Sequence, residues 1–202
     1  MAADERVGAK RKKGAAIPDY LVYEMDEGRP IYYRGYKEVI TKTKTLEDIM
    51  GCSILQSLLA TLISYFIKER FPPNYVCLGN ELGLKLAAKS RRNLDLAVYD
   101  KNRLPDRSVL FSTHYAQTPP QIVFEIDTKA DLSAFDTPAD YYHRKTEQLL
   151  GFGVEKVIWI FTGSRKYLFA EPGKKWSIGN WSEDMELLPD VQLNIEQLLE
   201  QV

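Results

Sequence analysis

Two carboxylates and one lysine are spaced so that they could do chemistry together. Glu125 and Asp127 lie in residues 121–127, whose β-branched and aromatic side chains predict a strand that starts after Pro119-Pro120. Since side chains alternate between the two faces of a strand, both carboxylates share one face and lie about 7 Å apart. Unpaired buried carboxylates are costly, so this face requires a cation.

Lys145 is the residue best placed to be that cation. It lies in residues 138–152, predicted to be a helix because proline suits the first turn and Gly153 follows the end. Tyr141 lies one turn before Lys145 and Leu149 one turn after it, so the lysine is in the middle of the apolar stripe that packs on the sheet. The spacing predicts an ammonium held near the two strand carboxylates.

Two structural interpretations of Lys145 stay open beside the catalytic one. The lysine could lay its methylenes along the apolar stripe and keep its ammonium in water. It could also form a purely structural ion pair with Asp127. Coordinates that show the ammonium turned outward into solvent would contradict the catalytic interpretation.

A third acid, Asp95, comes from a predicted hairpin. Residues 81–87 and 93–99 alternate in the manner of strands, and the link between them is short enough for an antiparallel turn. Asp95 lies on the polar face of the second strand. If the hairpin pairs beside the next strand with matching faces, Asp95, Glu125 and Asp127 converge on the side that the lysine can reach.

Three carboxylates and an ammonium in one concavity suit hydrolysis of a phosphodiester with Mg²⁺ or Mn²⁺. Hard carboxylate oxygens bind these ions, which acidify a water molecule and neutralise phosphate charge. The lysine would orient the attacking water or help to deprotonate it. A zinc or thiolate site fits poorly, because His114 and His143 are the only histidines and Cys52 and Cys77 lack metal spacing. We expect both cysteines to be reduced and mostly buried.

The composition is that of an ordinary soluble protein, with 45% apolar and 27% charged residues in 202. This length predicts one domain over residues 18–202 after a flexible basic tail over residues 1–17. The net charge of -1 argues against a bulk positive field for nucleic acid, but it allows a local basic surface. No apolar run reaches about 18 residues and no secretory segment is recognisable, so we expect a cytoplasmic protein without a membrane span.

The helices and strands predicted to position these residues together indicate a mixed α/β fold. Residues 18–40 alternate loosely, as an antiparallel decoration around Gly28 would. The core elements, in order, are a helix over residues 53–70, strands over 81–87, 93–99 and 121–127, a helix over 138–152 and a strand over 154–162, followed by an edge strand over 165–170 and a closing helix over 191–202.

This order of elements resembles the core of the PD-(D/E)XK restriction-endonuclease-like superfamily. The order of the acids is similar too, because Asp95 comes first and Glu125 follows within Ile-Val-Phe-Glu-Ile-Asp. More closely, four stretches are similar to the pattern of the Uma-type proposed restriction endonucleases, bacterial proteins of mostly unassigned biology. These stretches are Arg144-Lys145, Leu149, Gly153-Val154-Glu155 and Val157-Ile-Trp159. The resemblance covers residues 51–170, and its order and spacing are more specific than any single motif.

The resemblance implies a restriction-endonuclease-like fold, a Mg²⁺ or Mn²⁺ cofactor and DNA as the expected partner. Asp95 and Glu125 match the metal-binding acids of the superfamily. Lys145 matches its catalytic lysine, which in this branch lies on the following helix. No membrane partner is implied.

Two positions depart from the family pattern. Leu94 precedes the aspartate where proline is usual. Asp127 occupies the position of the superfamily's usual lysine, so it is either a further metal ligand or the partner of Lys145. Glu81 is a weaker candidate for a peripheral metal ligand, with an exposed strand residue as the alternative.

Two functions remain open. The first is a metal-dependent endonuclease acting on DNA, and the second is a catalytically inactive relative that binds nucleic acid or a protein partner through the same face. Lys89, Arg91 and Arg92 in the hairpin link are candidates for phosphate contacts, with a plain solvated turn as the alternative. Two-site cleavage of duplex DNA would favour a homodimer.

Overall fold

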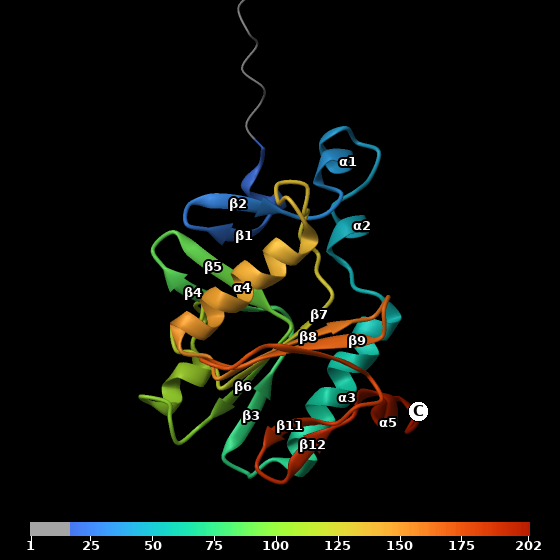
Figure 1. The fold of residues 1–202 in the computed structure, drawn as a ribbon. Coiled ribbons are helices and arrows are strands. Elements are labelled where there is room, and N and C mark those ends of the chain that lie inside the picture. Colours follow the sequence, from blue (N-terminus) through green and yellow to red (C-terminus); the bar gives the residue numbers. More distant parts are fainter. Residues whose placement is uncertain (1–16) are drawn as a thin grey trace, which may run out of the picture.

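The structure of the protein is a computed structural model that describes residues 17–202 (Figure 1). Two β-sheets meet near the centre of the fold, and the helices α3 and α4 cover the sheets from different sides. The predicted flexible tail over residues 1–17 lies outside the described residues, except for Ile17. No helix within residues 17–202 is long and apolar enough to cross a membrane.

A mixed six-stranded sheet forms the core, in the order β10-β9-β8-β7-β6-β3. The strands β7 and β8 run parallel and are joined through α4, whereas the other pairs are antiparallel. The predicted mixed α/β architecture is therefore confirmed. The bounds are Tyr75–Leu78 for β3, Leu96–Asp100 for β6, Ile122–Ile126 for β7, Lys156–Phe161 for β8, Lys166–Ala170 for β9 and Ser177–Asn180 for β10.

A second, antiparallel sheet has the order β2-β1-β5-β4. Its bounds are Val22–Asp26 for β1, Arg29–Tyr32 for β2, Leu82–Ala87 for β4 and Ser90–Leu94 for β5. The hairpin predicted around Gly28 is present as β1 and β2, with both Glu27 and Gly28 in the left-handed conformation that such a turn requires. The N-terminal segment is therefore an integral part of a sheet and not a peripheral decoration.

The prediction of a single hairpin strand over residues 93–99 is wrong, because these residues belong to two strands. β5 ends at Leu94 and β6 begins at Leu96, so the chain leaves one sheet and enters the other at Asp95. The predicted link over residues 88–92 mostly belongs to β5. Its polar residues can lie in a strand because they find partners there, as Ser90 does by accepting a hydrogen bond from the Glu27 amide at 2.9 Å.

Helix α3 (Ile54–Arg70) covers one face of the six-stranded sheet. Ser53 and Gln56 form a reciprocal capping box at its start, and the chain leaves the helix at Phe71, directly before Pro72-Pro73. Leu59, Ile63 and Ile67 form its buried stripe. Because Gln56 Nε2 also donates to the Ile126 carbonyl at 2.6 Å, the helix start is tied to the end of β7.

Helix α4 (Pro138–Phe152) packs where the two sheets meet (Figure 1). Thr137 and Asp140 form its capping box, and Gly153 ends it with a φ of 115°. Both ends therefore match the prediction from sequence. The buried face of the helix includes Tyr141, Lys145 and Leu149.

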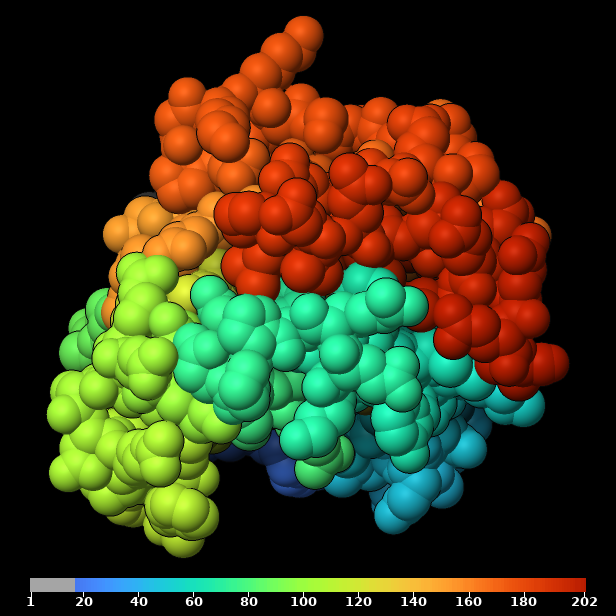
Figure 2. Space-filling model, turned by 90° about the horizontal axis from the view of Figure 1, so that it is seen from below, coloured from blue at the N-terminus to red at the C-terminus, as the bar shows by residue number. Residues whose placement is uncertain are grey.

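The predicted closing helix over residues 191–202 is too long. The segment forms β12 (Val191–Leu193), which pairs with β11 (Met185–Leu188), and only then the short helix α5 (Ile195–Leu199). Asn194 begins this helix by accepting from the Gln197 amide. Figure 2 shows this C-terminal segment lying against α3, which α5 contacts.

Two short helices and two 3₁₀ turns complete the described chain. Of the cysteines, Cys77 is half-buried and Cys52 is exposed, so the expectation that both are mostly buried fails for Cys52; neither forms a disulfide. The short elements are α1 (Tyr36–Ile40), α2 (Glu47–Met50), and the 3₁₀ turns Asp19–Leu21 and Arg107–Phe111.

Candidate functional site

Lys145 is fully buried, with 0% of its side chain exposed. Its Nζ lies 2.8 Å from Glu24 Oε1 and 2.9 Å from Glu125 Oε1, and it donates to the Asn93 carbonyl at 2.8 Å. The interpretation in which the ammonium reaches solvent is therefore wrong. The positive charge of the ammonium is therefore compensated within the protein by two carboxylates, and the Asn93 carbonyl accepts its hydrogen bond.

Glu24, on β1, is a buried partner of this lysine that the sequence interpretation missed. Its carboxylate accepts from Arg92 Nη1 at 2.8 Å, from the Tyr141 hydroxyl at 3.0 Å and from the Asn93 amide at 3.1 Å, in addition to its ion pair with Lys145. A signal was present, because Glu24 and Asp26 repeat in β1 the two-residue spacing of acids that drew attention to Glu125. In β1 both acids of this spacing belong to one buried network, because both pair with Arg92.

Arg92 is not a surface cation, so its predicted contact with nucleic acid is wrong. Only 1% of its side chain is exposed, and it pairs with Glu24 at 2.8 Å and with Asp26 at 3.2 Å. Gln148 and Arg144 on α4 complete this network around Asp26. Burial of a guanidinium is tolerated here because acids on the neighbouring strand surround it.

Asp127 does not partner Lys145. The strand β7 ends at Ile126, and Asp127 takes a left-handed conformation with a φ of 56°. This turn rotates its carboxylate toward Thr162, whose amide donates to it at 2.9 Å and whose hydroxyl also donates to it. The alternation that put Glu125 and Asp127 on one face fails because the extended backbone stops between them.

Asp95 lies at the crossing between the two sheets, beside Glu125. β6 and β7 pair antiparallel with Leu96 opposite Phe124, and the next position along this register brings Asp95 opposite Glu125. Asp95 Oδ2 accepts from the Ile126 amide at 2.6 Å. Of the predicted group, Asp95, Glu125 and Lys145 therefore lie together, whereas Asp127 turns away from them.

The pKa values of the two glutamates around Lys145 are shifted in opposite directions. Burial opposes ionisation of Glu24, but Lys145 and Arg92 together hold the pKa of its carboxyl below the usual value. Burial likewise opposes the charged form of Lys145, yet Glu125 and Glu24 raise the pKa of its ammonium, so the lysine is positively charged at neutral pH. Glu24 and Lys145 are thus a stable charged pair.

Glu125 is in the opposite situation. Burial raises its pKa well above the usual value, and the negative charges of Asp95 and Glu24 raise it further, while Lys145 compensates only in part. Its Oε1 is buried and lies 2.9 Å from the Lys145 ammonium, but no group of the described residues donates a hydrogen bond of the required geometry to it. Burial also raises the pKa of Asp95. The single ammonium of Lys145 therefore compensates the two acids only in part at the point where they face each other.

These observations fit a divalent cation. Within residues 17–202, no group of three or more His, Cys, Asp or Glu side chains is arranged to hold a metal ion. Mg²⁺ commonly uses only one or two carboxylates together with substrate oxygens and water, so Asp95 and Glu125 suffice as protein ligands. A cation between them would favour the charged forms that burial disfavours.

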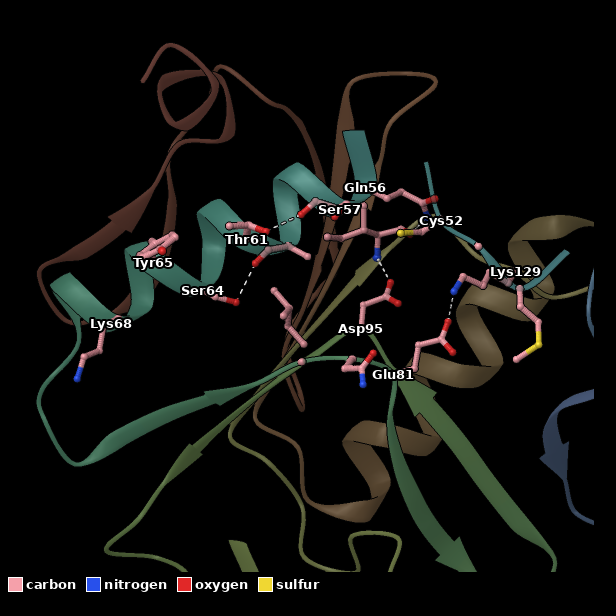
Figure 3. Close-up of a pocket in the computed structure, with 17 residues that line it drawn as sticks. Cys52, Gln56, Ser57, Thr61, Ser64, Tyr65, Lys68, Glu81, Asp95 and Lys129 are labelled. Carbon is pink, nitrogen blue, oxygen red and sulfur yellow. Dashed lines mark hydrogen bonds and ion pairs between the residues drawn. The ribbon is translucent and has the colours of Figure 1, made fainter. Parts of the chain in front are cut away.

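Asp95 opens into a cavity of about 760 Å³ between α3 and the loop that follows β3. Figure 3 shows Asp95, Glu81 and Lys129 pointing into this cavity, where Glu81 and Lys129 form an ion pair. Glu81 precedes β4 and is not an exposed strand residue. Lys129 was not identified from the sequence, although it follows Glu125 by only four positions.

The basic residues Lys89 and Arg91 lie away from this cavity, on the turn between β4 and β5 and on β5 itself. With Lys85 and Tyr115 they line a separate hollow, in which Arg91 donates to the Tyr115 hydroxyl at 2.9 Å. Their contact with nucleic acid stays a prediction.

Comparison with known proteins bears on the fold. A crystal structure of a proposed nuclease belonging to DUF820, from Anabaena variabilis ATCC 29413, is similar to this chain with a TM-score of 0.62. The two chains share a fold. The likeness covers 88% of this chain and 89% of that one at 14% sequence identity. It confirms at the level of the fold the resemblance to the Uma-type branch, whereas activity does not follow from fold. No protein-family model and no curated protein matches the sequence.

Proposed function

We propose that this protein is a Mg²⁺- or Mn²⁺-dependent nuclease that hydrolyses phosphodiester bonds, with DNA as the substrate. The observation that carries the proposal is the meeting of Asp95 and Glu125 beside Lys145, where Asp95 lines a solvent-accessible cavity and burial raises the pKa of both carboxyls. The shared fold with a proposed nuclease supports it.

Asp95 and Glu125 would hold the cation, which when bound supplies Lewis acidity and neutralises charge on a phosphodiester. Asp95 faces the cavity and is anchored through Oδ2 by the Ile126 amide, which leaves Oδ1 for a ligand. Glu125 lies behind it, fixed by the ammonium of Lys145.

Lys145 acts in this proposal as a positioning residue. Its ammonium stays protonated, because the neighbouring glutamates raise its pKa, and it is enclosed on all sides. A group in this state does not accept a proton from water at neutral pH. It holds Glu125 in one orientation and lowers the cost of two acids in one place.

Plasmid nicking tests the proposal. Purified protein should nick supercoiled DNA with Mg²⁺ or Mn²⁺ and should stop when a chelator is added. Asp95→Asn and Glu125→Gln should each reduce the rate by about 10³-fold or more, because each removes a ligand charge at the reacting centre. The control variant is Asp106→Asn, an exposed aspartate that caps a 3₁₀ turn. Equal nicking by wild type and Asp95→Asn would contradict the proposal.

A catalytically inactive protein that binds nucleic acid on the same face is the second candidate. It is favoured by the burial of Glu125 and Lys145, neither of which lines the cavity. This alternative predicts binding that depends on salt but not on metal, and no cleavage product. A metal site that can be titrated in the wild type and is lost in Glu125→Gln would count against it.

A further inference from the structure

Two lysines approach the candidate site, and they differ in what they can reach. Lys145 is completely enclosed, and its ammonium is occupied by Glu24, Glu125 and a carbonyl group. Lys129 has 17% of its side chain exposed and lines the same cavity as Asp95 (Figure 3). Of these two lysines, only Lys129 can contact a substrate that enters the cavity.

The backbone around Lys129 is held firmly. The Lys129 carbonyl accepts from the Arg34 amide at 2.7 Å, and Ala130 forms a β-bridge with Tyr33. On the other side, Thr162 fixes the left-handed turn at Asp127. A side chain presented from a segment tied down on both sides can be placed with the precision that a binding site needs.

Glu81, the partner of Lys129, is presented by an unusual backbone. Asn80 and Glu81 are consecutive left-handed residues, with φ of 67° and 55°, in the loop between β3 and β4. Such conformations are costly for residues other than glycine and are found preferentially at functional sites. The loop forms the wall of the cavity that faces α3, so it brings the Glu81 carboxylate to the rim near Asp95.

We propose that Lys129 binds a phosphate of the substrate next to the scissile bond, and that Glu81 occupies its ammonium while the cavity is free of substrate. The inference rests on the proposed nuclease function and specifies its substrate contact. A phosphate oxygen would replace the Glu81 carboxylate, so one ion pair is exchanged for another. The exchange is possible because solvent reaches both partners, with 17% of the Lys129 side chain and 27% of the Glu81 side chain exposed. No bond is made or broken in this step.

The chemistry of Lys129 suits a phosphodiester. An ammonium on a flexible stem acts as a point charge and binds phosphate through charge more than through fixed geometry. The cation expected at Asp95 and the ammonium of Lys129 would face the same anionic group from two directions. Such a contact positions nucleic acid irrespective of base sequence.

Binding of a fluorescein-labelled DNA 20-mer, measured by fluorescence anisotropy in Ca²⁺ over a series of salt concentrations, tests the inference. Lys129→Met should weaken binding about fivefold and reduce the slope of log K against log salt by about 0.7 to 0.9, as expected for one lost phosphate contact. Lys129→Arg should keep the wild-type slope, because the charge remains. The matched control is Lys156→Met, since Lys156 has 19% of its side chain exposed and pairs with Glu171 at 3.3 Å, far from the cavity.

Glu81→Gln gives a test of opposite sign. It should tighten DNA binding about twofold or more, because it removes a competing carboxylate, and it should have no such effect when combined with Lys129→Met. The inference would be overturned if Lys129→Met kept the wild-type salt slope, or if Glu81→Gln tightened binding equally with and without Lys129. In either case the nuclease proposal would stand as long as the wild-type protein binds and cleaves DNA. Wild-type protein that neither binds nor nicks DNA would overturn both.

Discussion

The two sides of Lys145 show how one ammonium serves two carboxylates of the same type in different ways. Glu24 lies 2.8 Å from it and Glu125 lies 2.9 Å from it, yet the pKa of Glu24 is lowered and that of Glu125 is raised. Arg92, Tyr141 and a backbone amide also donate to Glu24, whereas Glu125 has Asp95 as its neighbour. Distance to the lysine therefore does not decide the charge state.

The comparison separates the part of the site that holds the fold from the part that is available for chemistry. On the Glu24 side every buried charge has opposite charges or hydrogen-bond donors around it, as structural ion networks require. On the Glu125 side two acids share one ammonium, and the deficit opens toward the cavity through Asp95. A cation that enters from the cavity would correct this deficit.

The sharpest test of the comparison is Glu24→Gln. The substitution leaves Arg92 and Lys145 buried with too little negative charge, so the free energy of unfolding should fall by about 3–5 kcal/mol. Urea unfolding at pH 7 measures it. Glu27→Gln is the control, because Glu27 pairs with Arg144 at 3.0 Å but has 70% of its side chain exposed. A loss equal to that of this control would mean that the Glu24 side does not hold the fold.

The second prediction concerns the Glu125 side. Mn²⁺ at about 100 times its dissociation constant should raise the free energy of unfolding by about 2.7 kcal/mol, because it binds only the folded arrangement of Asp95 and Glu125. Thermal unfolding with metal and with chelator measures the difference. The effect should disappear in Asp95→Asn and persist in Asp106→Asn. An equal metal effect in both variants would place the cation elsewhere.

The third prediction is that substitution of Glu125 changes the free energy of unfolding in the opposite direction to substitution of Glu24. Glu125→Gln should stabilise the metal-free protein by about 1–2 kcal/mol at pH 8, because it removes a charge that burial disfavours. The pKa of Glu125 is higher in the folded protein than in the unfolded chain, where it is about 4.3. Below the unfolded pKa the carboxyl is neutral in both states and costs no stability. As the pH rises toward and through the folded pKa, the cost of ionising the buried carboxyl grows. Unfolding free energies between pH 4 and pH 8 should therefore diverge from wild type with increasing pH. A destabilised variant at pH 8 would contradict the proposed charge deficit.

The smallest effect is expected at the outer edge of the Glu24 network. Arg144 pairs with Asp26 and Glu27, but 41% of its side chain is exposed. Solvent weakens such pairs, so Arg144→Met should lower the free energy of unfolding by about 1 kcal/mol or less. A loss as large as that of Glu24→Gln in the same urea experiment would show that the network extends to the surface.

Local patterns were sufficient to predict the elements that position the site. The apolar spacing of α3, the caps and glycine of α4, and the apolar runs of β7 and β8 depend on neighbours within a few residues. The place of Lys145 in the apolar stripe of α4 could be inferred in the same way, whereas the position of its ammonium stayed open between the protein interior and water. The meeting of Asp95 with Glu125 required in addition the order of strands that the family resemblance supplied.

Contacts between distant segments could not be inferred in this way. Glu24 and Tyr141 lie 117 residues apart, and nothing in β1 alone shows that its acids meet α4 and Arg92. The direction of Asp127 depends on a single left-handed residue at the end of β7, and the direction of Lys129 depends on the pairing of the next segment with Arg34. The sequence by itself thus determined the helices α3 and α4, the strands β7 and β8, and the place of Lys145 in the apolar stripe of α4. Only the tertiary structure decided which acid neutralises that lysine and which acids remain short of charge, because these outcomes depend on pairing between remote strands and on the burial that results.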